Sequence, residues 1–252
     1  MEKELTIDIL SSVQKPARYT GGEFNSIVKS PEETEVSIAL AFPDIYEVGM
    51  SYLGFKILYH ILNLENGVAA ERVYAPWVDL EAKMRADAIP LRTLETEKIL
   101  QDFDFVVFTL QYELSYTNIL NMLDLGRIPV KTEERTEKDP FIIVGGPCVY
   151  NPEPLADFFD IFYIGEGETV YDELLDAYKT WKSSGKSRKA FLETAAQIEG
   201  LYVPAFYDPE YNAAGTLKSF VPNNINAPAT VKQPVVMDVT DASYHMNPVV
   251  HF

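Results

Sequence analysis

FIIVGGPCVYNPEPLADFFDIFYIGEGETVYDELLDAY, residues 141–178, is the stretch that decides the fold class. An apolar run at residues 141–144 ends on GGP at residues 145–147, and a second run at residues 161–164 ends on GEGE at residues 165–168. Short apolar runs with helical patterns between them are typical of buried parallel strands. Glycine at the carboxyl end of such a strand allows a sharp turn and the close approach of a ligand. The stretch therefore predicts two strands whose ends contribute to a ligand-binding edge.

The same alternation of apolar runs and helical patterns continues toward the amino terminus. Further strands are expected at residues 35–42, 72–74 and 103–110, and helices at residues 51–63, 78–88 and 114–125. Strands that alternate with helices in this way form a parallel sheet with right-handed crossovers. We therefore predict an α/β fold, a flavodoxin-like or Rossmann-like doubly wound parallel sheet, and its five main strands fit the order 2-1-3-4-5.

The segments on either side of the sheet have weaker patterns. A short amphipathic helix is expected at residues 2–12, a helix at 190–198 and a two-stranded hairpin at 201–222, whereas the residues after 222 show recurrent proline without a sustained period. These patterns predict four regions, which are an amino-terminal arm (1–34), the Rossmann-like domain (35–183), a helix and hairpin extension (184–222) and an extended linker (223–252).

Two groups of polar residues are expected in solvent. On the predicted helix at residues 51–63, Lys56, His60 and Asn63 fall opposite the apolar face. The segment KTEERTEKDP, residues 131–140, is predicted to be a solvated charged loop.

Composition narrows the class of partner. The 252 residues carry a formal net charge of −17, which argues against nucleic acid and anionic membranes as partners of this chain. No apolar run approaches the length of a membrane span, and MEKELTIDIL at the start lacks the pattern of a secretory signal. The single cysteine, Cys148, excludes an internal disulfide and favours the reducing cytoplasm.

Several motifs together resemble one family. GGP followed about twenty residues later by GEGE resembles the amino-terminal cobalamin-binding-type domain of radical S-adenosylmethionine (radical SAM) proteins. KPARYTGGEFN at residues 15–25 and FPDIYEVGMSYLG at residues 42–54 resemble a bacterial subfamily in which this domain precedes a radical SAM barrel. The resemblance implies an enzyme that uses an iron–sulfur cluster, held by three cysteines in CxxxCxxC, to cleave S-adenosylmethionine. Since this chain has one cysteine, we expect a non-catalytic fragment, without catalytic residues or metal ligands, whose partner is the barrel of the same polypeptide.

The resemblance can be followed residue by residue after the first predicted strand. Cobalamin-binding domains of the methionine-synthase and mutase type carry DxHxxG there; Asp44 and Gly49 match it, but Tyr46 stands in place of the histidine. Imidazole is a good neutral ligand for cobalt. A neutral phenol, with a pKa of about 10, is a far poorer one. We therefore expect either cobalamin bound without a histidine axial ligand or no cobalamin.

The other candidate cofactor-binding residues follow later strands. Thr109 stands near the serine of the family's SxL motif, although its spacing differs, and Gly145 and Gly146 match the GG motif. Because the carboxyl ends of parallel strands lie on one edge of a sheet, we expect these residues to converge. The complete candidate set is Asp44, Tyr46, Gly49, Thr109, Gly145, Gly146, Pro147, Gly165, Glu166 and Gly167.

Three functions remain open at this point. The first is a cofactor-holding domain, with cobalamin as its small-molecule partner. The second is an interaction or regulatory module that keeps the fold without the cofactor, which Tyr46 and the acidic surface favour. The third, a flavodoxin-like FMN domain, is weaker, because residues 43–45 are Pro-Asp-Ile and not a Ser/Thr-rich phosphate loop. Taken singly, GG and GEGE are also explained as a tight turn and a helix entry.

Overall fold

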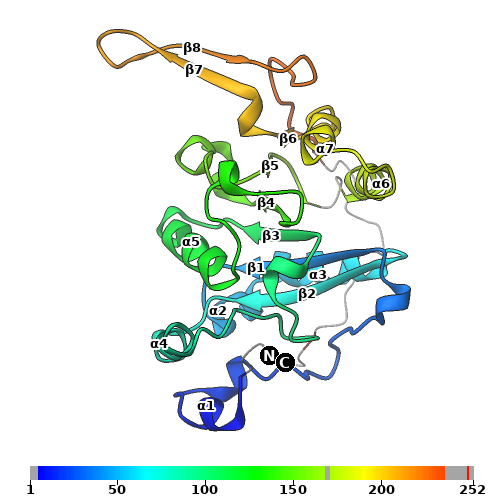
Figure 1. Ribbon diagram of the computed structural model, residues 1–252, viewed down its shortest axis with the longest axis vertical. Coiled ribbons are helices and arrows are strands. Elements are labelled where there is room, and N and C mark those ends of the chain that lie inside the picture. The colour runs from blue at the N-terminus through cyan, green and yellow to red at the C-terminus, as the bar shows by residue number, and fades with distance from the viewer. Residues whose placement is uncertain (1–4, 168–170, 236–248, 250–252) are drawn as a thin grey trace.

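A central six-stranded sheet organises the computed structural model, which describes residues 5–167, 171–235 and 249 (Figure 1). The strand order is β2-β1-β3-β4-β5-β6; the first five are parallel, and β6 runs antiparallel to β5. The predicted fold class and the order 2-1-3-4-5 are therefore confirmed. The strands are β1 (Val36–Phe42), β2 (Val68–Tyr74), β3 (Phe105–Thr109), β4 (Phe141–Gly145), β5 (Ile161–Tyr163) and β6 (Leu201–Tyr202).

Helices cover both faces of this sheet. Right-handed crossovers that run in opposite directions from the centre of a sheet place their helices on opposite faces. Helices α3 and α6 therefore share one face, and α4 and α5 share the other, where Arg85 of α4 binds Asp124 of α5 at 2.9 Å. The helices are α1 (Ile7–Ser11), α2 (Tyr46–Ser51), α3 (Leu53–Leu64), α4 (Val78–Asp87), α5 (Tyr116–Leu125), α6 (Tyr171–Lys182) and α7 (Arg188–Ala195).

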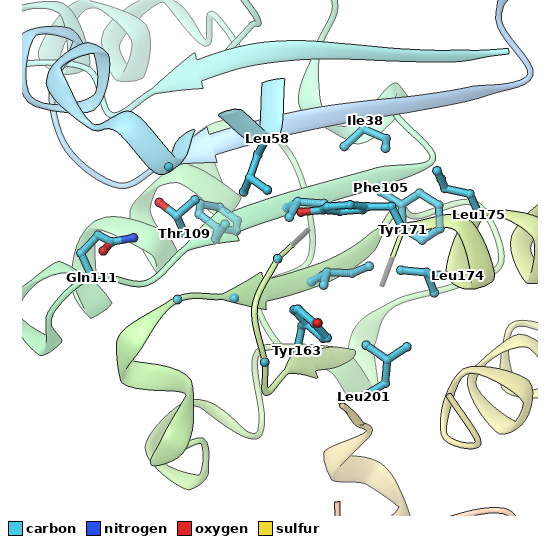
Figure 2. Close-up of a pocket in the computed structure, with 18 of the residues that line it drawn as sticks. Ile38, Leu58, Phe105, Thr109, Gln111, Tyr163, Tyr171, Leu174, Leu175 and Leu201 are labelled. Atoms are coloured by element: carbon cyan, nitrogen blue, oxygen red, sulfur yellow. The ribbon is translucent and has the colours of Figure 1, made fainter. Parts of the chain in front are cut away.

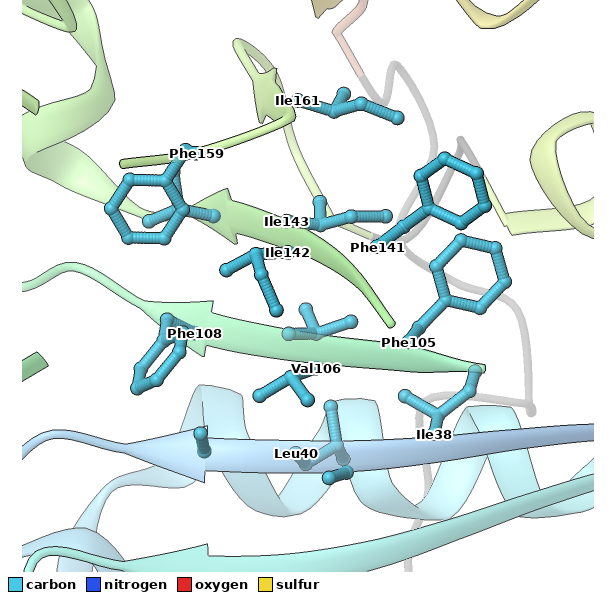
Figure 3. Close-up of a cluster of buried hydrophobic side chains, with 14 of the residues drawn as sticks. Ile38, Leu40, Phe105, Val106, Phe108, Phe141, Ile142, Ile143, Phe159 and Ile161 are labelled. Atoms are coloured by element: carbon cyan, nitrogen blue, oxygen red, sulfur yellow. The ribbon is translucent and has the colours of Figure 1, made fainter. Parts of the chain in front are cut away.

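Several aromatic rings pack together where α6 and α7 meet the sheet. All seven residues of β1 are buried, as expected for a parallel strand covered on both faces. The ring centroids of Phe105 and Tyr178 lie 4.4 Å apart, and those of Phe141 and Phe191 lie 4.5 Å apart. Figure 3 shows Phe105 and Phe141 side by side on neighbouring strands. These rings fill much of the space between α6, α7 and the amino-terminal ends of β3 and β4.

The hairpin prediction needs a correction. Leu201–Tyr202, expected to begin the hairpin, instead adds β6 to the central sheet, where Tyr202 pairs with Phe162. A short 3-10 turn at Pro204–Phe206 then ends this strand. The observed hairpin consists of β7 (Tyr207–Tyr211) and β8 (Leu217–Pro222), and it projects from the top of the molecule in Figure 1.

Two predictions of solvent exposure need correction at particular residues. Lys56 and Asn63 are buried. Asn63 Nδ2 donates to Ala70 O at 3.0 Å, and its Oδ1 accepts from Ala70 N at 3.1 Å, so this side chain pairs with the backbone of the edge strand β2. The segment at residues 131–140 is mostly exposed, as predicted, but Arg135 within it is buried and binds Asp160 at 2.9 Å. The burial of Asn63 and Arg135 is compensated because their side chains pair with backbone groups that would otherwise be unpaired.

The arm packs across the ends of β1 and β2, at the opposite end of the molecule from the hairpin (Figure 1). Arg18 binds Glu47 of α2 at 2.8 Å, and Tyr19 Oη accepts a hydrogen bond from Trp77 N at 3.1 Å. The arm thus fixes the segments that follow the first two strands. Within the described ranges, no helix has the length and apolar character needed to cross a bilayer.

The described part of the predicted linker, residues 223–235, contains no helix or strand. It packs back on the domain: Ala227 is buried, and Tyr207 Oη donates to Pro228 O at 2.7 Å. Residues 236–248 and 250–252 of the predicted linker lie outside the described residues, as do the first residues of the predicted helix at 2–12.

Candidate functional site

A cavity of about 170 Å³ lies between α3, α6 and the sheet (Figure 2). Its floor is formed by side chains of β1, β3 and β4 that point to the same face, and its walls by Leu58 of α3 and Leu174 of α6. Figure 2 shows Thr109 and Gln111 at one end and Leu174 and Leu175 at the other. The residues that line the cavity include Ile38, Leu58, Val107, Thr109, Gly145 and Leu174.

One end of the cavity lies at the carboxyl ends of β3 and β4, beside the point where the sheet order reverses. The connections after β1 and β3 leave in opposite directions there, which is where open α/β sheets bind ligands. Tyr112 Oη donates to Asp44 Oδ2 at 3.0 Å across this junction. This hydrogen bond joins the segment after β3 to the segment after β1 and places Asp44 at the edge of the sheet. Asp44 itself does not line the cavity.

Thr109 supplies a polar group inside this apolar space. Its side chain is on the last residue of β3 and is 5% exposed. Among the described residues its Oγ1 has no hydrogen-bond partner. A buried hydroxyl without a partner costs about 1–3 kcal/mol, so native structures rarely keep one. Thr109 therefore marks a place where a ligand atom or a water molecule completes the site.

The two glycines that end β4 have different roles. A Cβ at Gly145 would meet no atom within 4 Å, so this position leaves room in the wall of the cavity. Gly146 has a φ of +113°, and a Cβ there would lie 2.7 Å from Leu110 O. Glycine is thus needed at position 146 because of the positive φ and the close approach to the end of β3. At position 145 the fold does not need glycine, and a larger side chain would only fill space in the cavity.

The segment after β5 closes the same side of the cavity. Gly165 and Gly167 line it. A Cβ at Gly165 would lie 2.8 Å from Pro234 Cγ and 2.9 Å from Tyr163 Oη, so a larger residue would not fit. Pro147 and Glu166 are exposed and do not line the cavity. Glu168, the last residue of GEGE, lies outside the described residues.

Tyr46 and Gly49 are turned away from the cavity. Both lie in α2, and Tyr46 Oη donates to Glu23 Oε1 of the arm at 2.9 Å. Burial, with the adjacent Glu23 carboxylate, raises the pKa of Tyr46 to about 12. Gly49 is buried against Tyr74, whose ring would lie 2.3 Å from a Cβ at that position. The structure therefore brings five of the ten candidate residues together at the cavity, namely Thr109, Gly145, Gly146, Gly165 and Gly167.

Sequence reasoning missed the charge network that holds the arm. Arg72 is 1% exposed in β2 and binds Glu95 at 2.6 Å and Glu23 at 2.9 Å, with its guanidinium 5.1 Å from the centre of the Tyr59 ring. Burial acts to raise the pKa of Glu23, but the hydrogen bond and charge of Arg72 outweigh it, and the pKa is lowered. The sequence contained one signal for this network: Arg72 lies in a strand expected to be buried, and a buried charge needs a partner of opposite charge.

The edge around the cavity is rich in exposed apolar side chains. These residues follow β1, β2, β3 and β4, and they are Val48, Leu53, Trp77, Val78, Tyr112, Leu114 and Tyr150. In the part of the chain that the structure describes, no group of three or more histidine, cysteine or acidic side chains is placed to hold a metal ion. The chemistry of this edge is therefore that of an apolar surface with a narrow apolar recess into which the buried Thr109 hydroxyl projects.

Comparison with known proteins identifies a related family. Residues 54–204, more than half of the chain, match the family described as "Radical SAM proteins, N-terminal". The uncharacterized protein MJ0966 of Methanocaldococcus jannaschii is 27% identical over 133 residues, which make up 52% of this chain and 24% of that protein. The match thus spans about a quarter of the relative's length.

Proposed function

Since this chain belongs to the family of amino-terminal domains of radical SAM proteins, we propose that it holds cobalamin for a radical SAM iron–sulfur enzyme. On this proposal the chain is not catalytic by itself, and it presents the cofactor to a radical SAM barrel of the same polypeptide. The observation that carries the proposal is the apolar cavity at the strand ends, with the unpartnered Thr109 hydroxyl beside the open position at Gly145.

The size and polarity of the cavity fit the planar base at the end of the cobalamin nucleotide tail. An apolar cavity of roughly 150 Å³ in another protein binds benzene, so about 170 Å³ takes one aromatic group. The walls from α3 and α6 are leucines, which suit the faces and edges of such a ring. The Thr109 hydroxyl can donate to a ring nitrogen, and that hydrogen bond would satisfy a buried polar atom that has no partner among the described residues.

The position of Tyr46 supports binding without a protein axial ligand. Its phenol is neutral, donates to Glu23 and faces the arm, so α2 offers nothing to the metal of a corrin at the strand ends. The base of the tail would lie in the cavity and the corrin would rest on the exposed apolar edge, against side chains such as Tyr112 and Tyr150. When bound, cobalamin would supply a methyl carrier or an electron-transfer centre.

The rest of the proposed chemistry belongs to other parts of the polypeptide. A radical SAM cluster needs three cysteine thiolates, and this chain contributes only Cys148. Burial raises the pKa of the Cys148 thiol, which makes it a poor nucleophile and a poor ligand. We therefore assign S-adenosylmethionine and the iron–sulfur cluster to the barrel, and a reducing, cytoplasmic setting fits a chain without an internal disulfide.

A second candidate function is an interaction module that binds no cobalamin. The observation that favours it is the same apolar edge, because residues such as Leu114, 85% exposed, suit a protein partner as well as a corrin. In that case the cavity would be a packing defect, and the Thr109 hydroxyl would be satisfied by water.

The test is retention of corrin by the purified chain. We would titrate it with hydroxocobalamin and with methylcobalamin, remove free ligand by desalting, and record the visible spectrum. Corrin bands that are retained, with the shift expected when the lower base leaves the metal, would support the proposal. Absence of retention at high-micromolar cobalamin would refute it for this chain and favour the interaction module.

A further inference from the structure

The β7–β8 hairpin has an unusual distribution of side chains between its two faces. Directly opposed residues of an antiparallel pair point to the same face. One face carries three apolar pairs, which are Tyr207–Pro222, Pro209–Phe220 and Tyr211–Leu217. A register shift at Glu210/Tyr211 places Leu217, and not Lys218, opposite Tyr211. We call this set of six side chains the apolar hairpin face.

The other face of the hairpin is mainly polar and internally paired. Asp208 and Glu210 point to it, opposite Val221 and Ser219. Glu210 accepts hydrogen bonds from Lys218 Nζ at 3.1 Å and from Ser219 Oγ at 3.0 Å. The hairpin is therefore amphipathic. This distribution is typical of an antiparallel ribbon that packs one face against another surface and exposes the other face to solvent.

The hydrogen bonds and ring contacts that join the hairpin to the other described residues lie at its base. Tyr207 is 9% exposed, and its ring lies 4.9 Å from Tyr202 of β6 and stacks on Phe220 at 5.6 Å. Toward the tip, Tyr211 is 63% exposed and Leu217 is 57% exposed. Figure 1 shows the hairpin extending beyond the body of the molecule. Two-stranded ribbons are at best marginally stable alone, so this one is expected to gain stability from a partner.

We propose that the apolar hairpin face docks on the radical SAM domain that follows this domain in the same polypeptide. This inference rests on the proposed function only in placing such a domain there, and it does not depend on cobalamin. The family is by description the amino-terminal part of radical SAM proteins, and the match to the Methanocaldococcus jannaschii relative covers 24% of that protein. Most of such a polypeptide is therefore available as a tethered partner.

The area of the face favours a tethered partner over a second copy of this chain. Complete burial of Tyr211, Leu217 and Phe220 would remove on the order of 400 Å² from water. A stable complex of separate proteins buries about 800 Å² on each partner, which is about twice as much. A partner in the same polypeptide needs less, because a linker gives it an effective concentration of roughly millimolar. Pro209 also removes a donor from the edge of β7, which disfavours strand addition on that side.

The matching surface on the radical SAM domain should be apolar and nearly flat. The ribbon offers aromatic rings and prolines without an exposed charge on this face, since Lys218 and Glu210 are paired on the other one. Such a surface selects a partner by shape and apolar area, and its binding should be insensitive to salt. Contacts made through the acidic surface of the domain should instead depend on salt, so the salt dependence distinguishes the two kinds of contact.

Photo-cross-linking in the intact radical SAM polypeptide tests the proposal. We would place p-benzoylphenylalanine at position 217, on the apolar hairpin face, or at position 219, on the polar face, as a matched control. The expected result is an intramolecular cross-link from position 217 into the radical SAM domain, at least five-fold stronger than from position 219 and unchanged in 0.5 M salt.

Three results would overturn the proposal. They are cross-links between two copies, equal cross-linking from both faces, and no cross-link from position 217. A cobalamin titration of the same preparations has a separate spectroscopic readout. Failure of cofactor binding is therefore distinguishable from failure of the hairpin contact.

Discussion

Thr109 and Gly145 are direct partners in the parallel pairing of β3 and β4, and both line the same cavity. Partners in a parallel ladder point to the same face, so a side chain at position 145 would stand next to the Thr109 hydroxyl. One position provides a polar group without a partner, and the other provides space. A tight turn does not need an unpaired buried hydroxyl, and a well-filled core does not leave space beside one. The two features together therefore indicate a binding site.

Gly145→Leu is expected to close the cavity without harming the fold. The added side chain meets no atom within 4 Å at its Cβ, and Gly145 is not among the residues with positive φ. We expect the melting temperature to change by less than about 3 °C and retained corrin to fall at least ten-fold. The measurement combines thermal unfolding with the spectrum after desalting, and Ala213→Leu, in the turn of the hairpin, is the matched control. Full retention by a folded Gly145→Leu variant would exclude the cavity as the binding site.

Thr109→Val should change stability and binding in opposite directions. The substitution preserves shape and removes a buried hydroxyl that has no partner in the described part of the chain. We expect the free energy of unfolding without ligand to rise by about 1 kcal/mol and the affinity for corrin to fall by roughly 2- to 10-fold. Urea unfolding and a cobalamin titration measure the two quantities. A loss of stability in the absence of ligand would mean that the hydroxyl is already satisfied in the folded protein.

Gly146→Ala is expected to damage the fold itself. At a φ of +113° an alanine is strained, and its Cβ would lie 2.7 Å from Leu110 O. Both effects act on the backbone where β4 meets the end of β3, so we expect a loss of about 2–3 kcal/mol. Gly145→Ala, with an open position and an ordinary φ, should cost less than about 1 kcal/mol and serves as the control. Equal losses for the two variants in urea unfolding would contradict the separate roles assigned to these glycines.

The fold was predictable because its signals are local. Val36–Phe42 and Phe105–Thr109 are nearly continuous apolar runs, and helical patterns separate them, which is enough to predict a parallel sheet. The strand order was predicted from the resemblance to a family in which the flavodoxin-like order is usual. Leu201–Tyr202 was assigned to the hairpin because two residues cannot show a period. Their burial beside Phe162 is a tertiary effect that no short window records.

The candidate site was predictable only where topology determines it. Thr109 and Gly145 end adjacent strands, so the rule that ligands bind at strand ends brought them together. Leu58 and Leu174 were not predicted as cavity residues, because how closely α3 and α6 approach one another depends on packing. The sequence also could not show that the Tyr46 side chain points toward the arm. Its partner Glu23 lies in the arm, and the position of the arm depends on tertiary packing and not on a local pattern.

The arm should be held by a charge pair that weakens in acid. Glu23 binds the buried Arg72 at 2.9 Å, and its pKa is lowered from 4.5. A carboxyl group whose pKa is lower in the folded state than in the unfolded state stabilises the fold above the unfolded value, and this contribution is lost as the pH falls through the folded value.

Glu23→Gln is therefore expected to cost about 3–5 kcal/mol at pH 7, because it leaves Arg72 with one carboxylate fewer. The difference in the free energy of unfolding between the wild type and this variant should stay constant from pH 7 to about pH 5 and should shrink below about pH 4.5. Urea unfolding at a series of pH values measures it, and Glu32→Gln, at an exposed position of the same arm, is the control. A difference that does not change with pH would show that Glu23 acts through packing and not through its charge.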